Sequence, residues 1–205
     1  MKSRLTYRFF KRFFDIFSSS IAIILLSPVF LILGIIVKCT SKGPVFYSHK
    51  RVGKNGKEIG VLKFRSMVKN ADKLIENFSD EQKAEFQKYY KLENDPRVTK
   101  IGKFLRKTSL DELPQILNIF AGSLSFVGPR PITQEETLLY KKDRDLLLSV
   151  KPGLTGLWAV SGRSTLTYEE RIKLELKYVK ECSLWFDIKI FFKTIVPVFK
   201  SHGAK

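Results

Sequence analysis

The sequence is short of the residues that build the commonest reactive centres. It has two cysteines, Cys39 and Cys182, and two histidines, His49 and His202. Cysteines so few and so far apart exclude a disulfide framework and favour a reducing compartment. No familiar zinc spacing joins them to the histidines, so any metal is expected to be a hard, oxygen-bound ion such as Mg²⁺.

Nucleotide-binding signatures are absent as well. No P-loop or GxGxxG motif occurs, because Gly53, Gly56 and Gly60 have the wrong spacing and no helix signal follows them. No internal repeat, low-complexity tract or linker divides the chain. We therefore expect a membrane anchor over residues 1–40, followed by one integrated catalytic domain over residues 41–205.

Positive charge and phenylalanine are abundant. There are 37 lysines and arginines against 20 acidic residues, a net charge of +17, and 17 phenylalanines. This excess favours anionic partners, which are nucleic acid, acidic membrane lipid or phosphorylated substrates. The basic residues are spread along the chain and no nucleic-acid signature is present, so we expect no nucleic-acid partner. A membrane-tethered nucleic-acid-binding protein is the alternative.

Residues 16–37 carry no charge and would run roughly 33 Å as one helix, enough to cross a bilayer core. A single-pass anchor is the simplest interpretation, but two features favour a re-entrant helix-break-helix hairpin. Ser27-Pro28 stands near the middle, where proline removes a backbone bond and the serine hydroxyl can bond a freed carbonyl. Both flanks are basic, and the positive-inside rule favours the cytoplasm for each of them. Both can lie there only if the segment enters the bilayer and returns to the same side.

The rest of the chain predicts a mostly helical α+β fold. Strands are expected over residues 45–52 and 59–67 around the hairpin turn Asn55-Gly56. Two polar helices over 68–92, the second starting at Ser79, a short basic helix ending near Arg106 and a helix over 167–182 should follow. The last helix carries an apolar stripe that fits a protein core and a membrane surface about equally, comprising Leu184, Ile188, Phe191, Phe192, Ile195 and Phe199.

Two adjacent carboxylates, Asp111 and Glu112, lie where a helix should begin. Ser109 followed by Glu112 predicts a capping box, and Pro114 then falls within the first turn or so. The helix dipole would keep both carboxylates ionised and attract a phosphate. Such a pair beside cations suits phosphoryl transfer, in which one carboxylate attacks phosphorus while the other binds a metal.

Two other interpretations of the carboxylate pair stay open. Acidic residues in a first turn can simply cap the helix, and alone this is the better interpretation. A glycosidase also uses two carboxylates, but they flank a glycosidic bond about 5–9 Å apart and normally come from separate positions. Adjacent residues fit that requirement poorly.

Several cationic side chains are candidate phosphate contacts. Lys63 and Arg65 point the same way on one predicted strand and could hold a diphosphate, although a solvated strand face is the simpler interpretation. Arg130 lies between two prolines that fix its backbone. Arg163 follows the glycine-bearing loop 151–156, although such loops are more often plain turns.

Taken together, these stretches resemble the small monotopic phosphoglycosyl transferases of the bacterial sugar transferase family, of the undecaprenyl-phosphate hexose-1-phosphate transferase type. The match covers nearly the whole chain in the family's order. It rests on the following motifs: Ser27-Pro28, Lys63-Phe64-Arg65-Ser66-Met67, Asp95-Pro96-Arg97-Val98-Thr99, Leu105-Arg106-Lys107-Thr108-Ser109-Leu110-Asp111-Glu112-Leu113-Pro114-Gln115, Gly128-Pro129-Arg130-Pro131, and Lys151-Pro152-Gly153-Leu154-Thr155-Gly156-Leu157-Trp158.

The resemblance implies a reaction. Such enzymes transfer a sugar-1-phosphate from a nucleoside diphosphate sugar, usually a UDP-sugar, to polyprenyl phosphate, usually undecaprenyl phosphate, and release UMP. This is the first membrane step in making capsules, exopolysaccharides or O-antigens. It implies an active site at the cytoplasmic face of a bacterial membrane, with amphipathic interfacial helices around it and anionic lipid nearby.

The resemblance also assigns roles. The family's nucleophile falls on Asp111, its magnesium-binding carboxylate on Glu112, and its phosphate-binding arginine on Arg106. Arg130 matches the arginine of the family's Pro-Arg-Pro motif, while Lys63 and Arg65 carry over only as expected contacts.

The sequence also departs from the family pattern. Ala159 stands where many relatives have glutamine, which leaves the preferred donor sugar open. The chain begins almost at the predicted re-entrant helix, whereas larger members carry further membrane spans before it. The glycan pathway is open, and a homo-oligomer is compatible with the sequence.

Overall fold

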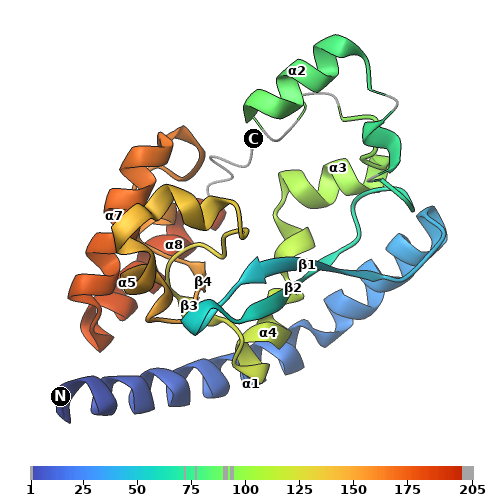
Figure 1. Cartoon of the computed structure of the whole chain (residues 1–205). Coiled ribbons are helices and arrows are strands. Elements are labelled where there is room, and N and C mark those ends of the chain that lie inside the picture. Colours follow the sequence, from blue (N-terminus) through green and yellow to red (C-terminus); the bar gives the residue numbers. More distant parts are fainter. Residues whose placement is uncertain (1, 72, 77, 90–91, 93–94, 200–205) are drawn as a thin grey trace.

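A long helix, α1 (Lys2–Thr40), runs along the underside of the molecule in the view of Figure 1. The structure is a computed structural model that describes residues 2–71, 73–76, 78–89, 92 and 95–199. For residues 2–4, 84, 86–89, 164 and 195–199 it describes the backbone alone. The predicted mostly helical α+β class is confirmed.

The elements after α1 alternate short strands and helices. The strands are β1 (Phe46–Val52), β2 (Glu58–Phe64), β3 (Ser125–Val127) and β4 (Gly153–Thr155). The further helices are α2 (Asp80–Tyr89), α3 (Lys100–Lys107), α4 (Gln115–Ala121), α5 (Arg144–Leu148), α6 (Leu157–Val160), α7 (Tyr168–Glu181) and α8 (Leu184–Phe199). Short 3-10 segments lie between them, namely η1 (Lys54–Gly56), η2 (Lys73–Ile75), η3 (Leu110–Glu112), η4 (Glu136–Asp143) and η5 (Arg163–Thr165).

Helix α1 passes through Pro28 without ending, so the predicted break into two helices is wrong. Proline 28 cannot donate to the carbonyl of Ile24 four residues earlier. The Ser27 hydroxyl donates to that same carbonyl at 2.8 Å, which is the compensation expected from the sequence. The helix therefore continues, and it bends along its length instead of folding back (Figure 1).

Both ends of α1 are fixed to the rest of the protein. Near the N-terminal end, Lys11 Nζ forms an ion pair with Asp187 Oδ2 of α8 at 2.6 Å, and buried Asp15 accepts a hydrogen bond from the Ser125 hydroxyl. Near the other end, Leu33 and Val37 pack in a core with residues of β2 and α3. The helix is thus held at both ends by the described part of the chain that follows it, here called the body.

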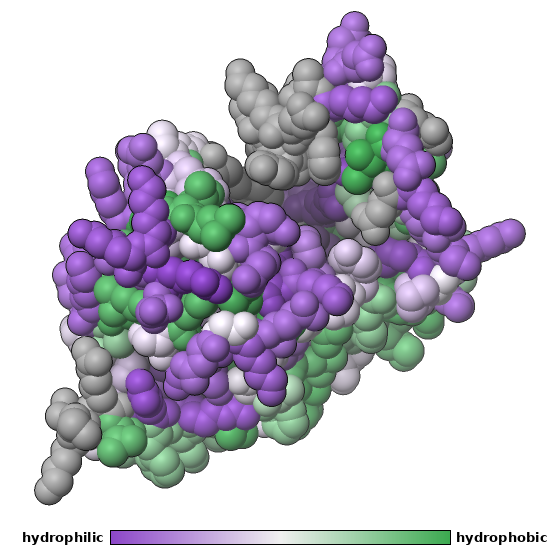
Figure 2. All heavy atoms as spheres, in the orientation of Figure 1, coloured by the Kyte–Doolittle hydropathy of each residue, from purple (hydrophilic) through white to green (hydrophobic). Residues whose placement is uncertain are grey.

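The middle of α1 faces outward. Large apolar side chains are exposed along it, among them Ile21, Ile24, Leu25, Leu31 and Ile32. Figure 2 shows hydrophobic residues along the lower edge, where α1 runs, and mostly hydrophilic residues above them. The segment Leu5–Thr40 is long and apolar enough to cross a membrane. Burial of such a surface in lipid is what its composition favours.

The hairpin prediction is confirmed. Strands β1 and β2 pair antiparallel, and the connection contains Asn55 at φ 58° and Gly56 at φ 77°. Asparagine and glycine adopt this left-handed region at the lowest steric cost, which is why the dipeptide ends one strand and begins the next.

A second pair of strands was not predicted. Strand β3 lies after the carboxylate helix, where no element was predicted, and β4 lies in the predicted loop 151–156; the two pair in parallel. Their backbones lie so close that a Cβ at Gly153 would come within 2.1 Å of Gly128 N. Glycine is required there because no side chain fits.

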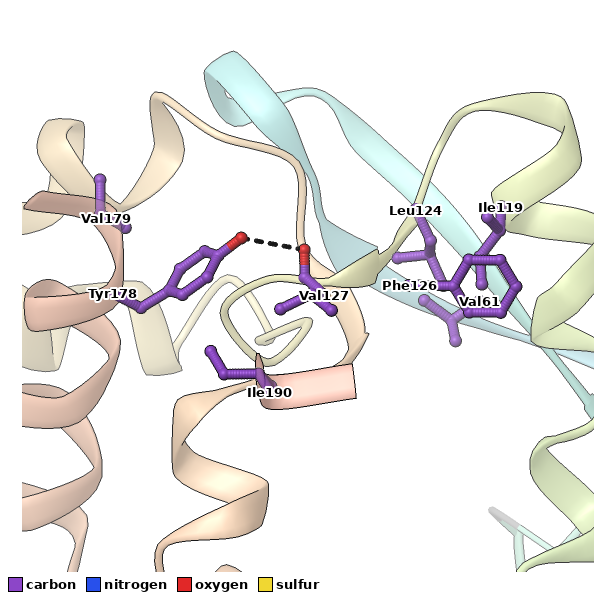
Figure 3. Close-up of a cluster of buried hydrophobic side chains, with 8 residues drawn as sticks. All are labelled: Val61, Ile119, Leu124, Phe126, Val127, Tyr178, Val179 and Ile190. Carbon is purple, nitrogen blue, oxygen red and sulfur yellow. Dashed lines mark hydrogen bonds between the residues drawn. The ribbon is translucent and has the colours of Figure 1, made fainter. Parts of the chain in front are cut away.

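The main core joins the hairpin to the C-terminal helices (Figure 3). It contains side chains from β2, α4, β3, α7, α8 and the turn before β3, namely Val61, Ile119, Leu124, Phe126, Val127, Tyr178, Val179 and Ile190. The Tyr178 hydroxyl donates to the carbonyl of Val127 at 3.2 Å, so this buried phenol is satisfied.

Other helix predictions had mixed outcomes. Helix α2 begins after Ser79, with the reciprocal Ser79–Gln82 bonds that were expected, and α7 begins with a capping box at Thr167. The other helix expected within 68–92 is wrong, because the described residues before Ser79 form only the 3-10 turn η2. Helix α8 has a core side, where Ile190 is buried, and an outer side, where Phe192 is exposed. The expected contact of its outer side with a membrane stays a prediction. The stripe residues Ile195 and Phe199 lie outside the described side chains.

Helix α3 packs on the segment after β2 through Gly102, and this contact can be tested. A Cβ at Gly102 would lie 1.9 Å from Ser66 O. We expect Gly102→Ala to lower the Tm of the purified protein by about 5 °C or more, because the helix must move away. Gly34→Ala is the control, since its Cβ would meet Val45 Cγ1 at an ordinary 3.6 Å. Equal Tm values for both variants would contradict this packing.

Candidate active site

Asp111 and Glu112 lie in η3, a single 3-10 turn between α3 and α4. The predicted capping box is wrong. Ser109 is left-handed, at φ 57°, and makes no side-chain cap; its hydroxyl accepts a bond from Arg163 Nη2 at 3.2 Å. Helix α4 begins later, after Pro114. The carboxylates therefore precede the helix, because the side chains of Ser109 and Glu112 have partners elsewhere in the fold.

The Glu112 carboxylate is bound by strand β2. Lys63 Nζ donates to Glu112 Oε1 at 2.7 Å, with both side chains about one-third exposed. Asn118 fixes the position of α4 along strand β2, because its side-chain amide accepts from Leu62 N at 2.8 Å and donates to Gly60 O at 2.7 Å. Sequence reasoning missed Asn118, although a lone asparagine within an apolar helix run was a usable signal.

Arginines from separate elements surround the pair. Arg106 Nε donates to the Ser66 hydroxyl at 2.9 Å, and the charge of Arg106 lowers the pKa of Asp111. The charges of Arg130 and Arg163 both lower the pKa of Glu112. The structure thus brings Lys63, Arg106, Arg130 and Arg163 together around the two carboxylates, as a phosphate-binding site requires.

Arg65 is placed differently from Lys63. Strand β2 ends at Phe64, and the Arg65 guanidinium donates to Ser41 O at 2.8 Å and to the Ser41 hydroxyl. Arg65 is therefore buried against the residue that follows α1 and is not paired with Asp111 or Glu112. Its expected role as a substrate contact stays a prediction.

The two carboxylates differ in acidity. Burial raises the pKa of Asp111, which is only 7% exposed, and the charge of Glu112 raises it further while Lys63 lowers it. Burial would also raise the pKa of Glu112, but the charge and hydrogen bond of Lys63 hold it below its usual value. The helix dipole expected from the sequence does not set the acidity of Asp111, because both carboxylates precede α4 and desolvation is the largest effect on this pKa.

The donor set suits a magnesium ion. No three His, Cys, Asp or Glu side chains gather as a metal cluster among the described residues. Magnesium in phosphate chemistry takes one or two carboxylates and completes its shell with water and substrate phosphates. Glu112 Oε1 accepts from Lys63, while Oε2 has no hydrogen bond to any described residue. Glu112 therefore fits as the protein ligand of such an ion.

His49 of β1 is a further residue that the sequence reasoning left out. Burial, together with the charges of Arg51 and Lys63, lowers its pKa to about 4. The imidazole is therefore neutral at physiological pH and does not add to the positive charge of the site.

Comparison with known proteins identifies the family. The model of the bacterial sugar transferase family matches residues 6–201. The chain belongs to the bacterial sugar transferase family. This confirms the resemblance inferred from its motifs and makes the protein a transferase.

Three relatives illustrate the similarity. The chain is 45% identical to the exopolysaccharide production protein ExoY of Rhizobium meliloti over 95% of its own length and 87% of the relative's. It is 46% identical to the undecaprenyl-phosphate galactose phosphotransferase of Salmonella typhimurium, over 96% of this chain. It is 41% identical to the UDP-glucose:undecaprenyl-phosphate glucose-1-phosphate transferase of Escherichia coli, also over 96% of this chain. The chain spans 42% of the length of each of the latter two relatives.

The Lys63–Glu112 pair makes a testable claim about this transferase's pH profile. If Asp111 is the attacking group it must be ionised, so a raised pKa moves the rise of kcat/KM to higher pH. Lys63 lowers that pKa. We expect Lys63→Met to move the acid limb of the profile to higher pH, by about one unit or more.

Lys50→Met is the matched control for that measurement. Lys50 lies on the same hairpin but pairs with Glu58 at 3.3 Å, where the side chains are 80% and 67% exposed. Its acid limb should stay in place. An unshifted limb in the Lys63 variant would show that Lys63 does not govern the ionisation of Asp111.

Proposed function

We propose that the protein transfers a sugar-1-phosphate from a UDP-sugar to undecaprenyl phosphate, with Asp111 carrying the sugar phosphate between two half-reactions. The observation that carries this proposal is a buried carboxylate of raised pKa, surrounded by cations, beside a second carboxylate that Lys63 keeps ionised. The names of the Salmonella and E. coli relatives both include undecaprenyl phosphate, the acceptor lipid proposed here.

In the first half-reaction, an Asp111 carboxylate oxygen attacks the sugar-bearing phosphorus of the donor. The bond from that phosphorus to the bridging diphosphate oxygen breaks, and UMP leaves with the electron pair. Asp111 is then esterified to the sugar phosphate. Its partial desolvation favours this step, because a carboxylate with few water contacts is a stronger nucleophile and has less solvation to lose.

In the second half-reaction, an oxygen of the lipid phosphate attacks the same phosphorus. The acyl phosphate bond breaks, Asp111 returns as a carboxylate, and a polyprenyl diphosphate sugar forms. Two displacements at one residue give ping-pong kinetics.

The cations make these attacks feasible. A carboxylate and a diphosphate repel each other, and Arg106, Arg130, Arg163 and Lys63 offset that repulsion with fixed positive charge. Glu112, together with donor phosphate oxygens, would hold a magnesium ion, which when bound supplies further neutralisation of the diphosphate. Lys63 already holds Glu112 ionised, in the state that a metal requires.

The anchor would bring this site to the lipid. Because one body holds both ends of α1, we propose that both ends lie on the cytoplasmic side while the apolar middle enters the bilayer. Exposed Trp185 and Phe192 on α8, beside Lys189 and Lys193, support a second contact with an anionic membrane surface. Polyprenyl phosphate could then reach Asp111 without leaving the membrane.

The covalent step predicts an adduct. Purified enzyme mixed with UDP-sugar and no lipid should gain the mass of one sugar phosphate, observed by intact-protein mass spectrometry and mapped to Asp111. Asp111→Asn should give no adduct and lose more than about a thousandfold in turnover, because the nucleophile is gone. Asp145→Asn, at an exposed position of α5, should behave as the unmodified protein. Unimpaired turnover of the Asp111 variant would overturn the proposal.

The anchor proposal predicts one-sided labelling. Cys39 is exposed at one end of α1 and needs no engineering, and Ser3→Cys would report on the other end in a Cys182→Ser background. A membrane-impermeant maleimide should label both from the cytoplasmic side only, together with Asp145→Cys as a marker of the body. Labelling of the two ends from opposite sides would refute the topology and leave the chemistry intact.

A further inference from the structure

Arg130 has an unusual set of contacts for a half-buried cation. Its Nε is buried and has no hydrogen-bond partner, and its guanidinium makes no hydrogen bond to any residue that the structure describes. Its charge nevertheless lowers the pKa of Glu112, so the guanidinium lies within electrostatic range of the carboxylate pair. A guanidinium in that state keeps its donors available for an anion.

The guanidinium is held by a ring. Arg130 Cζ lies 5.5 Å from the centre of the Trp158 ring, and Trp158 is only 8% exposed. A partly desolvated cation over an indole face is attracted by the ring. This contact restrains the guanidinium and uses none of its N–H groups.

Trp158 is itself fixed by the chain before it. A Cβ at Gly156 would lie 3.0 Å from both Cδ1 and Nε1 of the indole, so the Gly156 backbone packs directly on the ring. The segment from β4 to α6 therefore sets the ring position. The Trp158 Nε1 atom is also buried without a partner, so packing and the stack, not a hydrogen bond, hold the indole.

The backbone of Arg130 is held separately. Glu175 of α7, only 1% exposed, accepts from Arg130 N at 3.3 Å and from the Tyr140 hydroxyl. The main chain and the side chain of Arg130 are thus restrained by two different helices.

We infer that Trp158 is a positioning residue that holds the Arg130 guanidinium ready to clamp the diphosphate of the donor. This inference rests on the proposed function, because it assumes a nucleoside diphosphate at the carboxylate pair. Pre-organisation lowers the entropy cost of binding, so loss of the ring should weaken diphosphate binding through Arg130 alone.

A double-mutant cycle tests this claim, with UDP affinity as the measurement. Trp158→Leu should weaken UDP binding about tenfold, because the stack is lost. Trp158→Phe keeps an aromatic face and should lose less than about threefold. In an Arg130→Ala background, Trp158→Leu should change UDP affinity less than about twofold, since the group it acts on is absent.

The other tryptophan in the chain is the matched control. Trp185 is 76% exposed on α8, and Trp185→Leu should leave UDP affinity unchanged. A full tenfold loss from Trp158→Leu in the Arg130→Ala background would overturn the inference and indicate general damage to the site. Trp158→Phe weakening UDP binding as much as Trp158→Leu would overturn the inference too.

Adduct formation separates the two proposals. If the unmodified enzyme forms the Asp111 adduct while the cycle shows no coupling, only the positioning role fails. If that enzyme binds UDP with the expected coupling but never forms the adduct, the catalytic proposal fails and the positioning of Arg130 stands.

Discussion

The ion pair between Lys63 and Glu112 is the contact on which the arrangement of the site depends. It joins the hairpin to the turn that carries both carboxylates, at 2.7 Å. Asn118 makes that pair possible, because its side-chain amide ties α4 to β2 on either side of Val61. An exposed ion pair contributes little stability, so its value here lies in setting the charge of Glu112 and the acidity of its neighbour.

The same constraint explains why the two acids differ. Lys63 lies close enough to lower both pKa values, yet only Glu112 accepts its hydrogen bond. Asp111 is left buried with charge nearby and no direct ion pair among the described residues. Two neighbouring carboxylates thus reach different acidities through their surroundings, which suits the separate roles proposed for them.

Helix α1 and the body depend on each other. Polar groups early in the helix, including Lys11 and Asp15, would be costly within lipid, and the body satisfies them through Asp187 and Ser125. Apolar residues farther along are left exposed, and such a surface suits burial in a bilayer. The orientation proposed for the site relative to a membrane rests on the contacts that the rest of the chain makes with this helix.

Local sequence signals were reliable where nothing distant competed with them. Residues Asn55 and Gly56 make the predicted turn, and Thr167 with Glu170 makes a capping box, since each needs only neighbours in the chain. The equivalent signal at Ser109 failed. There Lys63 binds the Glu112 side chain and Arg163 binds the Ser109 hydroxyl, so partners 49 and 54 residues away replaced the local cap.

The sequence by itself determined the long apolar helix, the hairpin and the family, because these depend on composition, short spacing and motif order. It also singled out the carboxylate pair, whose chemical role is a proposal. Only the tertiary structure decided which cations act on that pair, since the charge of Arg130 lowers the pKa of Glu112 while Arg65 binds Ser41. It also decided the parallel pairing of β3 with β4 and the raised pKa of Asp111. Burial and long-range contact create these properties, and neither exists until the chain has folded.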